Sequence, residues 1–418
     1  MTRLNRIGAE KIFTIFVLIM PILNIYSTPV ISALRIGEVI GVFIIILLLA
    51  VNKAKFVITN KGYWIAIIYV CFISLMLTLF INNYSIGNTL VRIGRVLFYT
   101  YFAFRLAPVF WNWEYGKKVY IKLCVLTSAV LLLQFVVLQV FGQFVSFVIP
   151  NMNLSTNYAT SADYYAGMLR DLSWYGKGLR VSGFFLEPAH FCEYVIFSLV
   201  FLLLIEKKKF KDWLYIVIIT AAVAVSRSAL GFFTLSFIYG IFVIKAVKKR
   251  KISSKRIVTS VIIIIVGIFA MWKFGLLEEA LWRVATTSSE EATTGNLRLL
   301  RGFVIYNEMP ILFKVFGMGF GNFAEFIETY NIQTIFDSTL SRTNEFMNSI
   351  SVILVSGGII GLTLYVLSLI KIFLRSNKTQ KIIFWVVILI LATSNNFYKE
   401  SYMMSLIFMT CGQYRKNN

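Results

Sequence analysis

Long apolar runs separated by short polar connections constrain the fold of this 418-residue chain more than any other feature. The chain is 58% hydrophobic and only 14% charged. A helix that crosses a membrane needs roughly 20 predominantly apolar residues. We therefore predict an all-α integral membrane protein, with residues 1–418 forming one polytopic domain of about twelve transmembrane helices. The runs lie at residues 12–30, 35–51, 63–81, 89–110, 119–149, 189–205, 212–226, 228–245, 256–274, 346–373, 380–394 and 398–412.

Lysine and arginine are unevenly distributed between these runs. Most of the 41 basic residues fall in short connections on the side of the amino terminus, including the Lys-Lys-Arg-Lys run at 248–251. Because cytoplasmic connections of membrane proteins are rich in Lys and Arg, we expect both termini to be cytoplasmic. The net charge of +22 then follows from topology. We expect no nucleic-acid partner, because basic residues in short turns beside helices are placed to attract anionic lipid.

Cysteine and histidine residues are few, and the cysteines lie in apolar sequence, so they do not indicate a metal centre. The four cysteines lie within or beside apolar runs, and His190 is the only histidine. This pattern shows neither metal-ligand spacing nor a disulfide framework. We therefore expect no metal and no other cofactor.

Two connections, residues 150–188 and 275–345, are much longer than the others. Long connections in a compact fold are usually functional or disordered, and the apolar and aromatic residues in these two argue against disorder. We expect both on the outer face, with short surface helices, forming the active-site region. Residues 296–312 have a partial helical apolar period, which predicts an amphipathic helix that presents Arg298 and Arg301.

A cluster of ionisable residues ends the first long connection. Arg180, Glu187 and His190 lie within eleven residues, and Pro188 is suited to the first turn of a helix. This predicts Glu187 at the N-cap and His190 in the first turn, where either side chain could accept a proton from an attacking hydroxyl. The alternatives are an ordinary ion pair between Arg180 and Glu187, and a purely structural histidine.

Further polar candidates lie near the same membrane face. Arg227, between two apolar runs, could close a helical hairpin or bind phosphate. Arg92 shares a helix face with Arg95, which favours pairing with Glu38 or contact with lipid phosphate. Gly317 and Gly319, in Gly-Met-Gly-Phe-Gly, could form a tight turn or a close-packed wall beside a substrate. Asn344 and Glu345 end the second long connection.

Several of these motifs carry a resemblance to a known family. Residues 180–188, Arg-Val-Ser-Gly-Phe-Phe-Leu-Glu-Pro, look like its Arg-x-x-Gly-x-x-x-Glu-Pro segment. Ser226-Arg227 looks like its Ser-Arg helix entry, and Arg298 to Gly321 is similar to its arginine-bearing helix with a following Gly-x-Gly stretch. Asn344 and residues 357–361 look like its exit from the second long connection. On these motifs and on topology, the chain resembles the Wzy-type O-antigen and capsule repeat-unit polymerases, which share a superfamily with the O-antigen ligases.

The resemblance implies a metal-independent glycosyltransferase of the bacterial inner membrane. An acceptor hydroxyl on one lipid-linked repeat unit would attack the anomeric carbon of a glycan on undecaprenyl diphosphate, and the lipid pyrophosphate would leave. Arg180, Arg298 and Arg301 would stabilise that leaving group, and Glu187 or His190 would be the base. Implied partners are the lipid-linked oligosaccharide, membrane lipid, a chain-length regulator and a flippase. Implied substrate-binding residues are Arg92, Arg227, Gly317, Gly319, Asn344 and Glu345.

Two rival functions stay open. Ligases of the superfamily carry His-Asn where this chain has Thr343-Asn344, which disfavours a ligase and moves the base role to Glu187, His190 or Glu345. A flippase or other transporter would place polar groups near the bilayer midplane and on matching halves, whereas the ionisable residues here gather at one surface.

Overall fold

The structure, a computed structural model, describes residues 3–29, 33–51, 58–155, 159–204, 208–248, 294–337, 340–394 and 397–411. Within these ranges every regular element is a helix, and β-pairing is limited to isolated bridges such as that between Tyr26 and Leu154. The prediction of an all-α protein is therefore confirmed for the described part of the chain. The chain divides into two compact units, residues 1–51 with 114–285 and residues 52–113 with 286–418.

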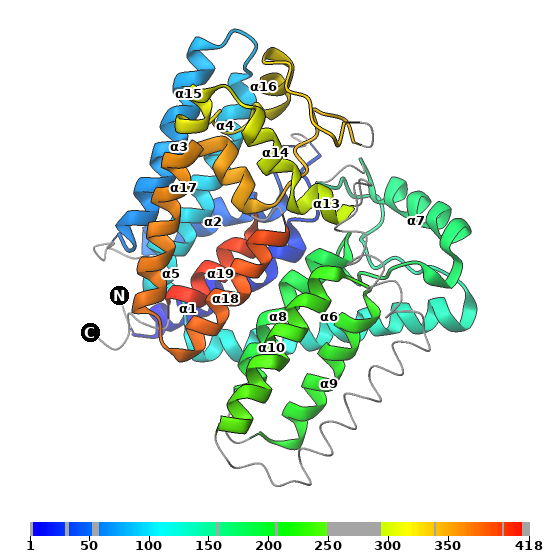
Figure 1. The fold of residues 1–418 in the computed structure, drawn as a ribbon. Coiled ribbons are helices and arrows are strands. Elements are labelled where there is room, and N and C mark those ends of the chain that lie inside the picture. The colour runs from blue at the N-terminus through cyan, green and yellow to red at the C-terminus, as the bar shows by residue number, and fades with distance from the viewer. Residues whose placement is uncertain are drawn as a thin grey trace. The chain divides into compact units, whose positions relative to one another are not determined.

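The first unit contains most of the first long connection. Its described helices are α1 (Arg3–Leu23), α2 (Ile36–Val51), α6 (Trp113–Phe141), α7 (Ser161–Tyr175), the 3₁₀ turn η2 (Gly176–Gly178), α8 (Pro188–Leu203), α9 (Phe210–Val225) and α10 (Ala229–Lys248). Helix α8 packs against both α9 and α10 (Figure 1). All but two residues of α8 are buried, as expected for a helix at the centre of a bundle.

The second unit is built around the pairing of α3 with α17, which run alongside one another (Figure 1). Its described helices are α3 (Lys61–Phe80), α4 (Ile86–Tyr101), the π-helical turn η1 (Phe102–Leu106), α5 (Ala107–Phe110), α13 (Thr294–Leu299), α14 (Arg301–Glu308), α15 (Ile311–Phe316), α16 (Phe323–Thr329), α17 (Ser349–Arg375), α18 (Lys378–Thr393) and α19 (Glu400–Thr410).

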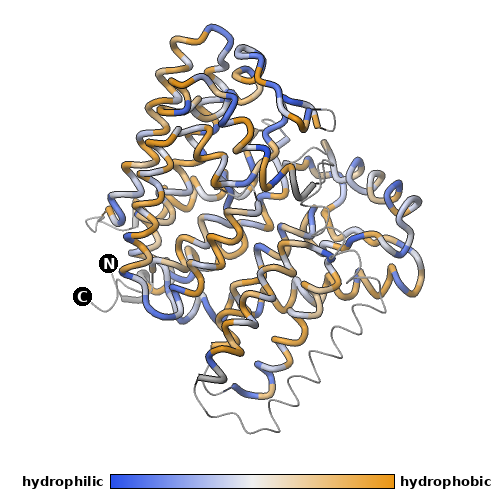
Figure 2. Tube along the Cα trace, in the orientation of Figure 1, coloured by the Kyte–Doolittle hydropathy of each residue, from blue (hydrophilic) through white to orange (hydrophobic). Residues whose placement is uncertain are grey.

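Each apolar run that the structure describes overlaps a helix, although the helix does not always fill the run. The run at 256–274 lies outside the described residues. Among the described helices, α3, α6 and α17 are long and apolar enough to cross a membrane by length and composition. Apolar residues cover most of their length (Figure 2). The membrane character of the chain is thus supported, while the count of twelve spans and the cytoplasmic termini stay predictions.

Exposed apolar side chains on these helices have the distribution expected for contact with lipid. Phe72 and Leu79 of α3 are 57% and 71% exposed, and Val140 and Phe141 of α6 are 64% and 68% exposed. Many large apolar side chains exposed on long helices indicate contact with a membrane or a partner rather than with water.

Helix α1 ends at Leu23, within the predicted run at 12–30, and two other boundaries differ from the sequence prediction for local reasons. Helix α6 ends at Phe141, although the apolar run continues to residue 149, because Gly142 has a positive φ of 65° and its N–H bonds to the Leu138 carbonyl at 3.0 Å. A glycine in this conformation terminates a helix. The run at 89–110 is interrupted by η1 just before Pro108, which lacks the N–H of a regular helical residue.

The predicted single helix over 296–312 is wrong. The structure has three short helices there, α13, α14 and α15, and Leu300 and Leu312, expected on the apolar face, are 49% and 59% exposed. The buried positions are instead spaced four apart, at Leu297, Arg301, Ile305 and Met309. Gly302 explains the shift, because a side chain there would collide with Ser351, so this face approaches α17 closely.

Candidate functional site

The predicted site residues fall into two groups, one in each compact unit. Arg180, Glu187, His190 and Arg227 belong to the first unit. The others, Arg92, Arg298, Arg301, Gly317, Gly319, Asn344 and Glu345, belong to the second unit.

The turn that connects Arg180 to Glu187 is buried against α6. Val181, Ser182 and Phe185 are each no more than 2% exposed. Gly183 has a positive φ of 63°, and a Cβ there would lie 3.3 Å from the Leu131 side chain of α6. The glycine in the Arg-x-x-Gly motif is therefore required by backbone conformation and by close approach to α6.

A single buried amide of α6 holds this turn. The Gln134 carbonyl oxygen accepts hydrogen bonds from the backbone N–H groups of Ser182, at 3.2 Å, and Gly183, at 2.9 Å. The Gln134 amide group donates to the Val145 carbonyl at 2.6 Å. Gln134 thus satisfies two buried backbone N–H groups that would otherwise lack partners, and it also bonds to the carbonyl of the more exposed Val145. Sequence reasoning missed this residue, although an amide inside an apolar run is a signal of such a role.

The two ends of the turn carry the ionisable side chains. Arg180 and Glu187 are both exposed, in contrast to the buried residues between them. Helix α8 begins at Pro188, with Glu187 as its N-cap and His190 in its first turn, as predicted. The Glu187 side chain makes no capping hydrogen bond, and its Oε2 lies 4.0 Å from Nε2 of His190. A rigid turn therefore presents an arginine at one end and a carboxylate–imidazole pair at the other.

Arg227 closes the connection between α9 and α10. Its backbone has a positive φ of 54°, and its guanidinium donates a hydrogen bond of 2.6 Å to the Gly178 carbonyl, two residues before Arg180. The hairpin role anticipated from the sequence is confirmed. Arg227 also fixes the start of the segment that leads into Arg180.

We expect Gln134→Leu to lower the free energy of unfolding by about 1–3 kcal/mol, because buried backbone groups of Ser182 and Gly183 lose their acceptor. The apparent melting temperature in detergent measures this. The matched control is Gln139→Leu on the same helix, since Gln139 bonds only to the Lys177 carbonyl in an exposed setting; we expect a change within about 0.5 kcal/mol. Equal melting temperatures for the two variants would contradict the anchoring role.

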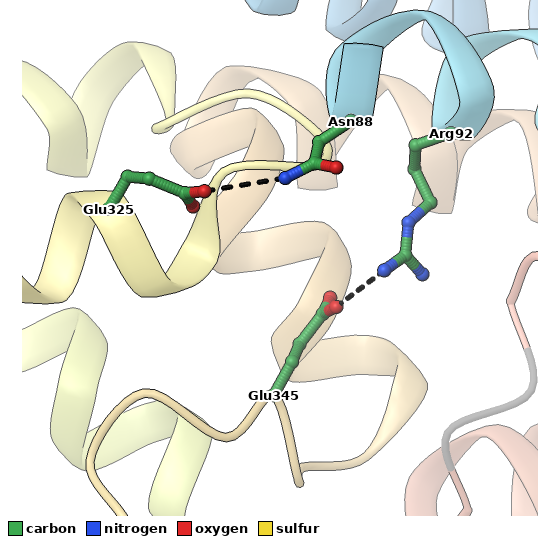
Figure 3. Close-up of polar contacts among 4 residues, drawn as sticks. All are labelled: Asn88, Arg92, Glu325 and Glu345. Atoms are coloured by element: carbon green, nitrogen blue, oxygen red, sulfur yellow. Dashed lines mark hydrogen bonds and ion pairs between the residues drawn. The ribbon is translucent and has the colours of Figure 1, made fainter. Parts of the chain in front are cut away.

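In the second unit, Arg92 of α4 pairs with Glu345. Its guanidinium lies 2.9 Å from the Glu345 carboxylate and 4.0 Å from the centre of the Tyr398 ring. One turn earlier on the same helix, Asn88 donates a hydrogen bond of 3.3 Å to Glu325 (Figure 3). The sequence favoured Glu38 as the partner of Arg92, and the structure instead pairs Arg92 with Glu345, from the second long connection.

Arg301 is fully buried, which contradicts the prediction that it is presented at the surface. Its guanidinium donates to the backbone carbonyls of Ser341, at 3.2 Å, Arg342, at 2.9 Å, and Asn344. Burial lowers the pKa of this guanidinium, and the nearby Asp337 opposes that shift. An arginine is nonetheless always charged in proteins. The cation therefore organises the turn that precedes Glu345.

Arg298 differs from Arg301 in being only half-buried. Its guanidinium carbon lies 4.9 Å from the centre of the Phe346 ring. Asn348, the N-cap of α17, donates to the Arg298 and Leu299 carbonyls at 2.9 and 3.1 Å and accepts from the Ser351 N–H. Asn348 was not predicted, although an asparagine before an apolar helix is a recognisable N-cap signal.

Gly317 and Gly319 allow backbone-to-backbone packing against a break in α17. Gly358 interrupts that helix with a φ of 62°. At the break, the Met318 and Gly319 N–H groups donate to the Val355 and Ser356 carbonyls at 3.0 and 2.9 Å. A Cβ at Gly317 would collide with the backbone of Ser356. The glycines thus have a packing role, and substrate contact by Gly317 and Gly319 stays a prediction.

No protein-family model matches the chain, and no curated protein matches it significantly.

Proposed function

We propose that this protein is a bacterial inner-membrane glycosyltransferase that joins undecaprenyl-diphosphate-linked repeat units into O-antigen or capsular polysaccharide. In this proposal the chain has about twelve spans, cytoplasmic termini and both long connections on the outer face. The observation that supports it most is the buried turn with Arg180 exposed at one end and Glu187 and His190 at the other. The chemistry of these side chains fits a leaving pyrophosphate and an attacking hydroxyl.

Each end of the turn has one role in this reaction. As the acceptor hydroxyl attacks the anomeric carbon, its proton passes to Glu187 or His190. The bond from that carbon to the pyrophosphate breaks, and negative charge develops on the leaving oxygen. Arg180 stabilises this charge with its planar, permanently charged guanidinium. Because the turn is held by Gln134, these groups are positioned before substrate binds.

In the second unit, the half-buried Arg298 and the Arg92–Glu345 pair are the proposed substrate contacts. Arg92 is one-quarter exposed and already paired, so it offers remaining N–H donors to a sugar or phosphate oxygen. Asn344 is exposed and adds an amide beside this pair. Arg301 supports these residues from within the fold.

The second candidate function is transport of the same lipid-linked glycan. The observation in its favour is the break at Gly358, because transporters place substrate and ion sites at discontinuous membrane helices. In this structure, however, the carbonyls of Val355 and Ser356 at the break are occupied by Met318 and Gly319. The ligase reaction is the other alternative and uses the same donor.

The decisive experiment incubates purified full-length protein with the lipid-diphosphate-linked repeat unit as the sole substrate and resolves the products by size. A polymerase produces a ladder because each repeat unit is both donor and acceptor. A ligase gives a product only when its lipid acceptor is added, and a flippase gives none but moves the substrate across sealed vesicles. Folded protein that gives no ladder would contradict the proposal.

A further inference from the structure

We infer that α7, in the first long connection, lies in the membrane–water interface with Trp174 and Tyr175 in contact with lipid headgroups. This helix is well formed in its own right, because Thr160 and Asp163 make a reciprocal capping box at its start. Its inner side is defined by Ser161, Tyr164 and Gly167, which are buried at a spacing of three.

Four large apolar or aromatic side chains of α7 are exposed, two in its middle and two at its end. Tyr165 and Leu169, four residues apart, are 41% and 42% exposed. At the end of the helix, Trp174 and Tyr175 are 73% and 65% exposed. Trp and Tyr are enriched at membrane interfaces because one part of each side chain is apolar and the other can hydrogen-bond.

The end of α7 is attached to a defined level of α6. The Gln139 side chain of α6 donates a hydrogen bond of 2.8 Å to the Lys177 carbonyl, just past the end of α7. Gln139 directly precedes Val140 and Phe141, the exposed apolar residues of the last turn of α6. Since α6 is long and apolar enough to span a membrane, we infer that its last turn lies near the level at which the chain leaves the hydrocarbon. Figure 1 shows α7 beside this end of α6.

The charges beside these aromatics complement an anionic lipid surface. Arg170 and Lys177, before and after Trp174, are both exposed, and the acidic Asp171 between Arg170 and Trp174 is half-buried, so the net charge of this segment is positive. Basic side chains at this level pair with lipid phosphate while their stems contact apolar surface. Arg180 follows three residues after Lys177, so the same anchor would hold it at the depth of a lipid diphosphate. That consequence rests on the proposed function, whereas the placement of α7 does not.

The test measures the depth of single labels on the full-length protein in nanodiscs of phosphatidylethanolamine and phosphatidylglycerol. All four native cysteines are buried, so a nitroxide label can be directed to one introduced cysteine. Labels at Trp174→Cys and Leu169→Cys report the depth of α7. A label at Ser173→Cys reports the same depth in a protein that keeps both Trp174 and Tyr175. Val140→Cys is the hydrocarbon reference. Glu328→Cys, at an exposed charged position of α16, is the water reference.

For each label we measure the rate of collision with oxygen divided by the rate of collision with a water-soluble nickel complex. We expect this ratio to be several-fold higher for labels at residues 169 and 174 than for the label at residue 328. We also expect it to be lower at both positions than at residue 140. Ratios equal to that at 328 would place α7 in water and overturn the inference. Low collision with both reagents would show that protein covers the helix, such as a second copy, and would also overturn it. Activity is not involved, so this outcome is independent of the proposed reaction.

Discussion

Arg180→Ala is expected to reduce the rate of ladder formation by roughly 100-fold or more while leaving the melting temperature unchanged. Loss of one preorganised donor to developing negative charge typically costs about 100- to 1000-fold in kcat. Arg180 is exposed at the end of the turn, so its removal leaves the buried contacts of Val181 and Ser182 intact. The measurement is the initial rate of chain extension from the purified lipid-linked repeat unit, together with a thermal unfolding scan.

Two further variants make this prediction specific. Arg180→Lys keeps the charge but loses the planar pair of donors, so we expect a rate between those of the alanine variant and the wild type. Arg375→Ala removes another exposed arginine, from the C-terminal end of α17, and we expect wild-type activity. If Arg180→Ala kept most of its activity while folded, Arg180 would have no role at the leaving group.

The start of α8 shows what the sequence was able to predict. Pro188 fixes the first turn of a helix through its backbone geometry, a local effect that needs no knowledge of the fold. The positions of Glu187 and His190 follow from it, and all three agree with the structure. Arg227 was similarly predictable as a residue that joins two helices, because it stands between two apolar runs.

The second long connection shows where prediction failed. Arg298 and Arg301 were both expected on an exposed helix face. In the structure Arg301 is fully buried, and Arg298 is half-buried. Helical periodicity in one segment cannot reveal which face another helix covers. That choice was made by Gly302, which lets α17 approach, and by the carbonyls of Ser341, Arg342 and Asn344, which accept hydrogen bonds from the guanidinium. Both are long-range effects, and they have no signature in the local apolar pattern.

Arg301→Ala is expected to lower the free energy of unfolding by about 3 kcal/mol or more, because the buried guanidinium makes three hydrogen bonds and a hydrogen bond to a charged group contributes about 1.5–3 kcal/mol. The acceptors are the carbonyls of Ser341, Arg342 and Asn344. Ladder formation should fall as well, since the turn that precedes Glu345 is no longer held. The thermal unfolding midpoint in detergent and the rate of ladder formation are measured on the same preparation.

The combination of the two readouts separates a supporting arginine from a catalytic one. A residue that only binds pyrophosphate would lose activity without losing stability, as expected for Arg180. Arg301→Lys should recover little of the stability, because an ammonium cannot reproduce the planar fork that reaches three carbonyls. Arg298→Ala is the matched control, since Arg298 is half-buried and stacks on Phe346. If Arg301→Ala proved as stable as Arg298→Ala yet inactive, Arg301 would act on the substrate directly, as its motif first indicated.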